Sequence, residues 1–392
     1  MALFARLIAA CLLLLADHGF TSPLKDVSSV SNRRDVATAS ASYTLPRLVI
    51  YFQTTHDAST GQPISMLPLI TQKGIALTHL IVCSFHIGSP SSSSTPELHL
   101  NDYPPSDPRF TTLWQEAALL QAAGVRVMGM VGGAAPGSFA TDTLDSTDTA
   151  TFEAAYKQLH DAIVTYGLQG MDLDVEQAMS QAGITRLVER LNSDFGPSFE
   201  VTAAPVASAL QTSGNGANLS GFNYTTLAST LAKTSGSGIS FYNAQFYNGF
   251  GSVATPDDYE AIVHPPDWTW TTNEILLGQI TAPSEGYGYV APGMLNQTVI
   301  ALRDHYGASH PLGGVMGWEY FDSAPGGTAA PWQWAQDMTA ILRPGQTPAL
   351  YVTSRDAEQL QTAYKASVVK GSGGSVSTNS VPLVDYMAMV NA

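Results

Sequence analysis

Three carboxylates alternate along one short apolar segment of the chain, and their types and spacing are suited to catalysis. Asp172, Asp174 and Glu176 are separated by single apolar residues. Because alternate residues of a β-strand point to the same side, the three acids would share one face of a strand. Burying acids side by side is costly unless they are paired or functional, so the pattern favours a catalytic site.

Two other interpretations of these acids are weaker. A metal-binding carboxylate set would be expected to include a histidine, and none lies nearby in the sequence. A solvated edge strand would not have the buried character of the flanking residues. We therefore expect neither a metal nor a cofactor, and the sequence also carries no phosphate-loop or nucleophile-elbow motif.

The elements that would position these acids alternate regularly from about residue 46. Short apolar runs predict eight strands, at 47–54, 78–87, 125–132, 168–175, 199–205, 239–247, 275–281 and 313–320. Amphipathic segments between them predict helices, most clearly at 152–163. Eight strand–helix units over roughly 300 residues predict a (β/α)8 TIM barrel without a large insertion domain, and a doubly wound open sheet is the alternative. The acids would then stand at the C-terminal end of the fourth strand, where such barrels place their active sites.

Four short motifs lie at or near the ends of expected strands: Met130–Gly133, Asp172–Glu176, Gln245–Asn248 and Gly313–Trp318. Together they resemble motifs of glycoside hydrolase family 18, the chitinases and their relatives. The Asp-x-Asp-x-Glu run resembles the family signature at the fourth strand. Met130–Gly133 resembles the Gly-Gly motif that ends the third strand, and Gln245–Asn248 resembles the sixth-strand motif of plant and fungal class III chitinases. Gly313–Trp318 resembles the end of the eighth strand. The motifs occur in the family's order across nearly the whole expected barrel.

The resemblance implies retaining hydrolysis that is assisted by the substrate. Glu176 would protonate the leaving glycosidic oxygen, and the 2-acetamido oxygen of the sugar would attack the anomeric carbon. Asp174 would hydrogen-bond the acetamido nitrogen, and Tyr247 would hold the acetamido oxygen. Asp172 would share a proton with Asp174 and so support it.

The same resemblance places further residues around the substrate. Trp318 would lie under the bound sugar, although a core position is also open to it. The remaining candidates for the mouth of the barrel are Gln245, Asn248, Tyr51, Gly133 and Phe85, with packing as the default role for Tyr51 and Phe85. Trp268 and Trp270 could extend the cleft or pack on the surface.

One position departs from the family pattern. The motif usually begins with an Asp at the position that Gln169 occupies here. Because Gln cannot share a proton with Asp172, we expect weakened coupling between the acids and a lowered activity or shifted pH optimum.

Three functions fit these residues. The first is an endo-acting chitinase with an open groove, since the strand at 275–281 is followed closely by a helix near Pro292. The second is an endo-β-N-acetylglucosaminidase that cuts the chitobiose core of N-glycans. The third is an inactive chitin-binding lectin, which is disfavoured because Glu176, Asp174 and Tyr247 are all present.

The ends of the chain predict processing and secretion. Residues 1–22 resemble a signal peptide, because Arg6 precedes the apolar run Leu7–Leu15. Residues 23–45 would form a propeptide or flexible arm with a dibasic site ending at Arg34, residues 46–343 the catalytic domain, and residues 344–392 an extension of unknown role. Sequons at positions 218, 223 and 296 suit a secreted, extracellular glycoprotein.

The composition of the chain excludes some classes of binding partner. Seventeen basic and 32 acidic residues give a net charge of −15, which argues against binding to nucleic acid or to an anionic membrane surface. We expect a monomer that binds chitin or another glycan containing N-acetylglucosamine. Beyond the leader, Cys83 is the only cysteine, and its apolar surroundings predict an inert core thiol.

Overall fold

The computed structural model describes residues 45–88, 96–211, 216–234, 236–264 and 269–348. The expected leader, residues 23–44 of the expected arm, Trp268 and residues 349–392 of the expected extension lie outside the described residues. Among the helices that are described, none is both long and apolar enough to cross a bilayer.

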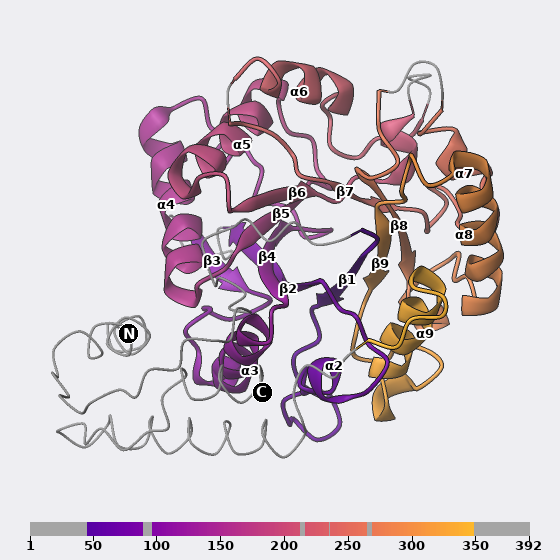
Figure 1. Ribbon diagram of the computed structural model, residues 1–392. Coiled ribbons are helices and arrows are strands. Elements are labelled where there is room, and N and C mark those ends of the chain that lie inside the picture. The colour runs from indigo at the N-terminus through magenta and orange to yellow at the C-terminus, as the bar shows by residue number, and fades with distance from the viewer. Residues whose placement is uncertain (1–44, 89–95, 212–215, 235, 265–268, 349–392) are drawn as a thin grey trace, which may run out of the picture.

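The core of the molecule is a closed parallel barrel, seen nearly along its axis in Figure 1. Eight strands pair in parallel around the ring, and β1 closes it by pairing with both β2 and β9. A short strand, β3, adds antiparallel to the end of β2. The strands are β1 (Arg47–Phe52), β2 (His79–Gly88), β3 (Glu97–Leu100), β4 (Arg126–Gly132), β5 (Gly170–Asp174), β6 (Glu200–Ala203), β7 (Tyr242–Gln245), β8 (Ile275–Ile280) and β9 (Gly314–Trp318). The predicted TIM barrel is confirmed, and β3 is an addition that the sequence did not indicate.

Helices surround the barrel and cover the outer face of its strands (Figure 1). They are α2 (Pro68–Thr71), α3 (Thr111–Ala122), α4 (Thr149–Tyr166), α5 (Gln181–Phe195), α6 (Tyr224–Leu231), α7 (Asp257–Glu260), α8 (Pro292–Tyr306) and α9 (Trp332–Leu342). The ends of the long helices follow local chemistry. Asp148 and Ser180 cap the first turns of α4 and α5 by accepting hydrogen bonds from backbone N–H groups.

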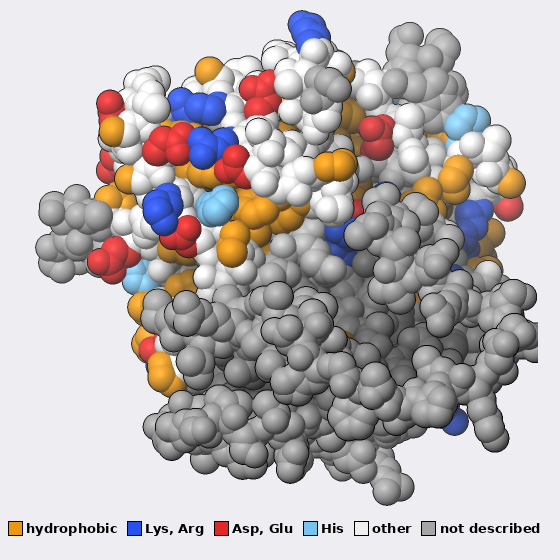
Figure 2. All heavy atoms as spheres, turned by 60° about the vertical axis from the view of Figure 1, so that its left-hand side comes forward, with side chains coloured by type: hydrophobic (Ala, Val, Ile, Leu, Met, Phe, Trp, Pro, Cys, Tyr) orange, Lys and Arg blue, Asp and Glu red, His pale blue; other side chains and the backbone are white. Residues whose placement is uncertain are grey.

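The outer surface of α4 and α5 carries charges of both signs, which Figure 2 shows intermingled. Arg190 contacts both Glu153, at 2.5 Å, and Asp194, at 2.9 Å. Basic side chains on this face are therefore matched by acids, and the face presents no field of a single sign.

Two apolar layers hold the barrel together. The larger one lies between the strands and the helices, and it contains the apolar faces of α3, α4, α5 and α8. The smaller one fills the barrel interior with side chains that alternate with the outward-facing ones, including Met128, Met130, Leu276 and Met316. Cys83 belongs to this interior layer, is fully buried and forms no disulfide, as predicted for a core thiol. This packed floor supports the polar residues that lie above it at the mouth.

Candidate active site

The three acids rise from the barrel interior toward its mouth. Asp172 is 0 % exposed and Asp174 is 5 % exposed, and both lie in β5. Glu176 follows the strand and is partly exposed. A strand advances roughly 7 Å over two residues, so each acid stands higher than the one before it. Of the three, Glu176 is the one placed to meet a ligand, while Asp172 lies too deep to touch one.

Donors from three other strands surround Asp172. Its Oδ2 accepts a hydrogen bond from the Tyr51 hydroxyl at 2.7 Å. Its Oδ1 accepts bonds from Thr202 Oγ1 at 2.5 Å and from Asn243 Nδ2 at 3.1 Å. Burial raises the pKa of Asp172, and these three donors oppose the rise by stabilising the ionised form.

This arrangement corrects the expectation that Asp172 shares a proton with Asp174. Both oxygens of Asp172 are engaged by donors from elsewhere, so its influence on Asp174 is electrostatic. Burial and the charges of Glu176 and Asp172 raise the pKa of Asp174 well above that of a free carboxyl group. Three donors therefore stabilise the ionised form of Asp172, whereas burial and the neighbouring charges disfavour the ionised form of Asp174.

Gln245 connects the two upper acids. Its Nε2 lies 3.1 Å from Asp174 Oδ1, 3.2 Å from Glu176 Oε1 and 2.9 Å from the carbonyl oxygen of Ala204. The bond to Ala204 fixes the amide at the end of β6, and the amide in turn orients both carboxyl groups. Gln245 thus lies at the site, as predicted, but there it bonds to the acids, whereas it was expected to bind the substrate.

Aromatic residues complete the site around the acids. Tyr247 is 6 % exposed, and burial together with the charge of Asp174 raises its pKa well above the ordinary value, so it stays a hydroxyl donor. Trp318 is partly exposed at the end of β9 and packs against Tyr51, with ring centroids 5.5 Å apart. Tyr51 itself is buried beneath the mouth, where it donates to Asp172.

Two glycines let the end of β4 approach β5 closely. Gly132 has a φ of +109°, and a Cβ built on it would lie 2.1 Å from the carbonyl oxygen of Asp174. Gly133 has a φ of +90°, and its N–H donates to that same oxygen at 2.9 Å. A side chain at Gly132 would displace the backbone that carries Asp174, which explains the Gly-Gly motif.

Three of the residues considered for the mouth have other roles in the structure. Phe85 is buried outside the barrel, stacked at 6.4 Å on Trp114 of α3, so it does not line the mouth. A register shift between Val82 and Phe85 interrupts the regular alternation of β2. The side to which Phe85 points therefore does not follow from its position in the sequence. Trp270 is buried with its indole N–H bonded to the Leu210 carbonyl, so packing is its role.

Asn248 is the third of these residues. Its N–H donates to the Tyr287 carbonyl at 2.7 Å, and its Oδ1 accepts from the Tyr287 N–H at 2.9 Å. The side chain expected to bind substrate is therefore used to hold another loop.

Gln169 also has a different environment from the one expected. Its Oε1 accepts a hydrogen bond from the N–H of Val127, and its carbonyl oxygen accepts from Arg126. Residues three apart on a strand face opposite sides, so Gln169 and Asp172 do not share a face. The side chain at this position serves the pairing of β4 and β5, and the expected change in the coupling of the acids has no basis in the geometry.

Four residues important to the site were missed in the sequence. Thr202 and Asn243 bond Asp172, and both are polar residues at inward positions of otherwise apolar strands, which was a usable signal. Glu319 is buried and accepts hydrogen bonds from Gln53 N at 2.9 Å and from Thr54 N at 2.8 Å, so it ties the loop after β1 to the end of β9. Tyr287 gave no signal, because nothing in the sequence links it to Asn248.

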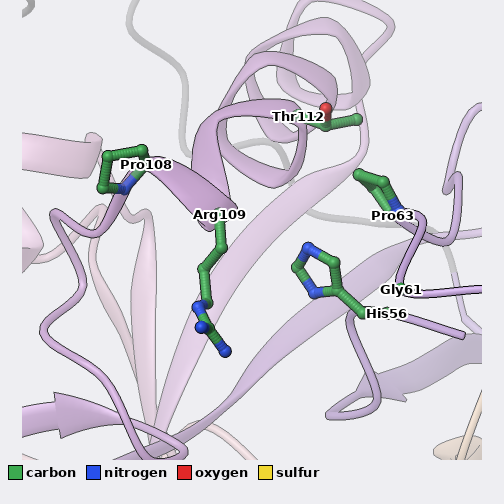
Figure 3. Close-up of a pocket in the computed structure, with 6 residues that line it drawn as sticks. All are labelled: His56, Gly61, Pro63, Pro108, Arg109 and Thr112. Carbon is green, nitrogen blue, oxygen red and sulfur yellow. The ribbon is translucent and has the colours of Figure 1, made fainter. Parts of the chain in front are cut away.

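Figure 3 shows a cavity of about 470 Å³. It lies between the loop after β1 and the start of α3, and in Figure 3 His56 and Arg109 extend along it from opposite walls. Its other lining residues are Gly61, Pro63, Pro108 and Thr112. The loop after β1 and the start of α3 both lie on the mouth side of the barrel, and so does this cavity.

Comparison with known proteins places this geometry in a family. No family model and no curated protein matches the chain. Among solved structures, a fungal endo-β-N-acetylglucosaminidase from glycosyl hydrolase family 18 is 58 % identical, with a TM-score of 0.70, and the match covers 77 % of this chain and 100 % of that one. The chitinase ChiC from Aspergillus fumigatus is 40 % identical, with a TM-score of 0.63, over 75 % of this chain and 99 % of that one.

A more distant structure, a putative chitinase A from Streptomyces coelicolor, is 18 % identical, has a TM-score of 0.55 and shares the fold, over 75 % of this chain and 97 % of that one. The two closer matches extend over practically the whole length of their own chains. This chain therefore belongs to glycosyl hydrolase family 18 and is a glycoside hydrolase.

Proposed function

We propose that the enzyme hydrolyses the β-1,4 bond between two N-acetylglucosamine residues with retention of configuration, and that its substrate is the chitobiose core of N-linked glycans. The observation that supports this reaction most directly is that the amide of Gln245 hydrogen-bonds both Asp174 and Glu176. It places one partly exposed acid beside one buried acid, the pairing that substrate-assisted hydrolysis requires.

The first step of the reaction uses these side chains as follows. Glu176 donates its proton to the glycosidic oxygen as the bond from that oxygen to the anomeric carbon breaks. The acetamido oxygen of the retained sugar attacks the same carbon and closes an oxazolinium ring. Asp174 hydrogen-bonds the acetamido nitrogen, where positive charge develops, and the Tyr247 hydroxyl donates to the acetamido oxygen.

The second step returns the enzyme to its starting state. Water attacks the anomeric carbon, Glu176 takes a proton from that water, and the ring opens to restore the acetamido group. Two inversions at the same carbon give net retention. Trp318 supports the sugar from below, and Asp172 acts through its charge on Asp174.

The identity of 58 % to an endo-β-N-acetylglucosaminidase favours the glycan core as substrate. The tryptophans of the described residues agree with this choice. Trp114, Trp270 and Trp334 are buried, Trp332 packs against the core, and Trp318 alone reaches the mouth within the described ranges. A long linear chitin chain would be better served by a row of aromatic platforms.

Chitin is the second candidate substrate. The identity of 40 % to the chitinase ChiC favours it, and the proposed chemistry is the same. Secretion remains part of the proposal in either case. It rests on the N-terminal segment and on Asn218 and Asn223, two sequon residues that are exposed on the surface.

One digestion distinguishes the candidates. The purified enzyme is incubated in parallel with a denatured glycoprotein that carries high-mannose N-glycans and with chitohexaose, and the products are identified by mass spectrometry. We expect the glycoprotein to lose its glycans and to keep a single N-acetylglucosamine at each site, while chitohexaose is cut far more slowly. Rapid cutting of chitohexaose with an intact glycoprotein would make the enzyme a chitinase, and no cutting of either would overturn the proposed activity.

A further inference from the structure

Tyr287 has an unusual position for a tyrosine. Of the exposed large apolar side chains in the described ranges, it is the most exposed, at 79 %. Other members of that group, Val164 and Ile300, lie on the outer helices α4 and α8. Tyr287 instead lies in the connection that follows β8, on the mouth side of the barrel.

The backbone of Tyr287 is fixed beside the active site. Asn248, the residue after Tyr247, exchanges two hydrogen bonds with it, at 2.7 and 2.9 Å. Asn248 adopts a left-handed φ of +55°, which Asn tolerates better than most residues. A Cβ on Gly288 would lie 3.5 Å from the Cα of Tyr247, so the loop packs directly on that tyrosine.

The opposite side of the same loop is also anchored. Ser284 Oγ donates to Asp322 Oδ2 at 2.5 Å, and the Thr281 carbonyl accepts from Ala324 N at 3.0 Å. The loop is thus held to the connection after β7 and to the segment after β9. An aromatic ring on a fixed backbone loses little entropy when it binds a ligand, which suits it to recognition.

We propose that the ring of Tyr287 is a stacking surface for a sugar on the non-reducing side of the cut, with Asn248 as its positioning residue. Around the barrel the strands follow one another in the order β5, β6, β7, β8. Glu176 follows β5, Tyr247 follows β7 and Tyr287 follows β8, so Tyr287 is farther from Glu176 around the barrel than Tyr247 is. Glu176 must face the leaving oxygen, and so marks the reducing side. Tyr287 therefore borders the part of the glycan that the enzyme retains, and the face of a sugar ring provides the apolar surface that an aromatic ring can cover.

This inference rests on the proposed function, because it requires a glycan at the mouth. The test uses the two products of the proposed reaction, neither of which can be cleaved again. One is a high-mannose glycan that ends in a single N-acetylglucosamine, and the other is a peptide that carries N-acetylglucosamine on Asn. Their dissociation constants are measured by calorimetry for the wild-type enzyme and for Tyr287→Ala, Tyr287→Trp and Ile300→Ala.

We expect Tyr287→Ala to weaken binding of the glycan about tenfold, which corresponds to about 1.4 kcal/mol, and to leave binding of the peptide unchanged. Tyr287→Trp keeps an aromatic face and should bind the glycan as the wild type does, as should Ile300→Ala, which removes an exposed side chain from α8. An unchanged constant for the glycan in Tyr287→Ala overturns the inference, and so does a loss confined to the peptide. A wild-type enzyme that binds neither product and cleaves no glycoprotein would instead refute the proposed function.

The role of Asn248 is tested by separating KM from kcat. Asn248→Gly keeps access to the left-handed φ and removes the acceptor of the Tyr287 N–H, whereas Asn248→Asp retains an acceptor. We expect Asn248→Gly to raise KM for the glycopeptide several-fold with little change in kcat, and Asn248→Asp to restore the wild-type KM. A fall in kcat with an unchanged KM would assign Asn248 to the chemistry instead of to positioning.

Discussion

The hydroxyl group of Tyr51 donates a 2.7 Å hydrogen bond to Asp172 across the interior of the barrel. This bond joins β1 to β5 and, with Thr202 and Asn243, surrounds a fully buried carboxyl group with donors. A group that only accepts hydrogen bonds is stabilised in its ionised form. Burial, then the charges of Glu176 and Asp172, raise the pKa of Asp174, the next acid along β5.

Replacing Tyr51 by Phe should therefore change the pH dependence of the reaction. The substitution keeps the ring and removes one donor, so the pKa of Asp172 should rise further and its charge should be lost at a higher pH. We expect the acidic limb of the kcat/KM profile to move to higher pH, with a lowered maximum. A profile that coincides with that of the wild type would show that the charge on Asp172 does not act on the reaction.

Asp174 should make the protein less stable as the pH rises. Burial raises its pKa in the folded state above the ordinary value of about 3.9. Its contribution is fully present below that ordinary value and is lost as the pH rises through the raised pKa. Asp174→Asn cannot ionise, so its Tm should exceed that of the wild type by about 2–4 °C at alkaline pH and by much less near pH 4. Thermal denaturation of both proteins across this range checks the prediction, and a constant difference in Tm would contradict it.

Glu285, a carboxyl group in the loop after β8, should make the protein less stable as the pH rises toward about 8. Burial, and then the charge of Asp322, raise the pKa of Glu285 to about 8. Because this folded-state value exceeds the ordinary one, stability is lost as the pH rises through about 8. Glu285→Gln should remove this fall, so that the Tm of the variant changes less than that of the wild type between pH 6 and 9. Parallel slopes for the two proteins would exclude this effect.

The contact between β4 and β5 can be tested with a matched pair of glycine variants. Gly132 and Gly124 both have positive φ, at +109° and +92°, so Ala strains the backbone at each. A Cβ at Gly132 would also meet the Asp174 carbonyl at 2.1 Å, whereas nothing lies within 4 Å of a Cβ at Gly124. We expect Gly124→Ala to lower the free energy of unfolding by about 1 kcal/mol and to keep full activity. Gly132→Ala should lower the free energy of unfolding several times more and should abolish hydrolysis. If the two variants lost stability and activity equally, the contact between β4 and β5 would not be the cause.

The sequence predicted the barrel well because its strands follow a simple rule. Each of the eight parallel strands coincides closely with one of the mostly apolar runs, and the alternation within β5 placed Asp172 and Asp174 on one face. That alternation survives in the structure because β5 pairs regularly with both neighbours.

The mouth was predicted less completely, because its residues depend on contacts that are distant in sequence. Phe85 was misplaced since the register shift in β2 interrupts alternation. Asn248 was taken as a ligand for the substrate because its partner, Tyr287, lies 39 residues away on a different connection. Thr202 and Asn243 could have been found, since polar residues within apolar strands require partners.

The proposed chemistry depends most directly on Glu176, and a glycopeptide with a high-mannose N-glycan provides the test. The single-turnover rate of cleavage is measured for the wild type and for Glu176→Gln, which keeps the size of the side chain and cannot donate the proton to the leaving oxygen. A positioned general acid contributes roughly 10²–10⁴-fold, so the variant should cleave more slowly by at least that lower factor. A variant that cleaves the glycopeptide at the wild-type rate would contradict the assignment of Glu176 as the acid.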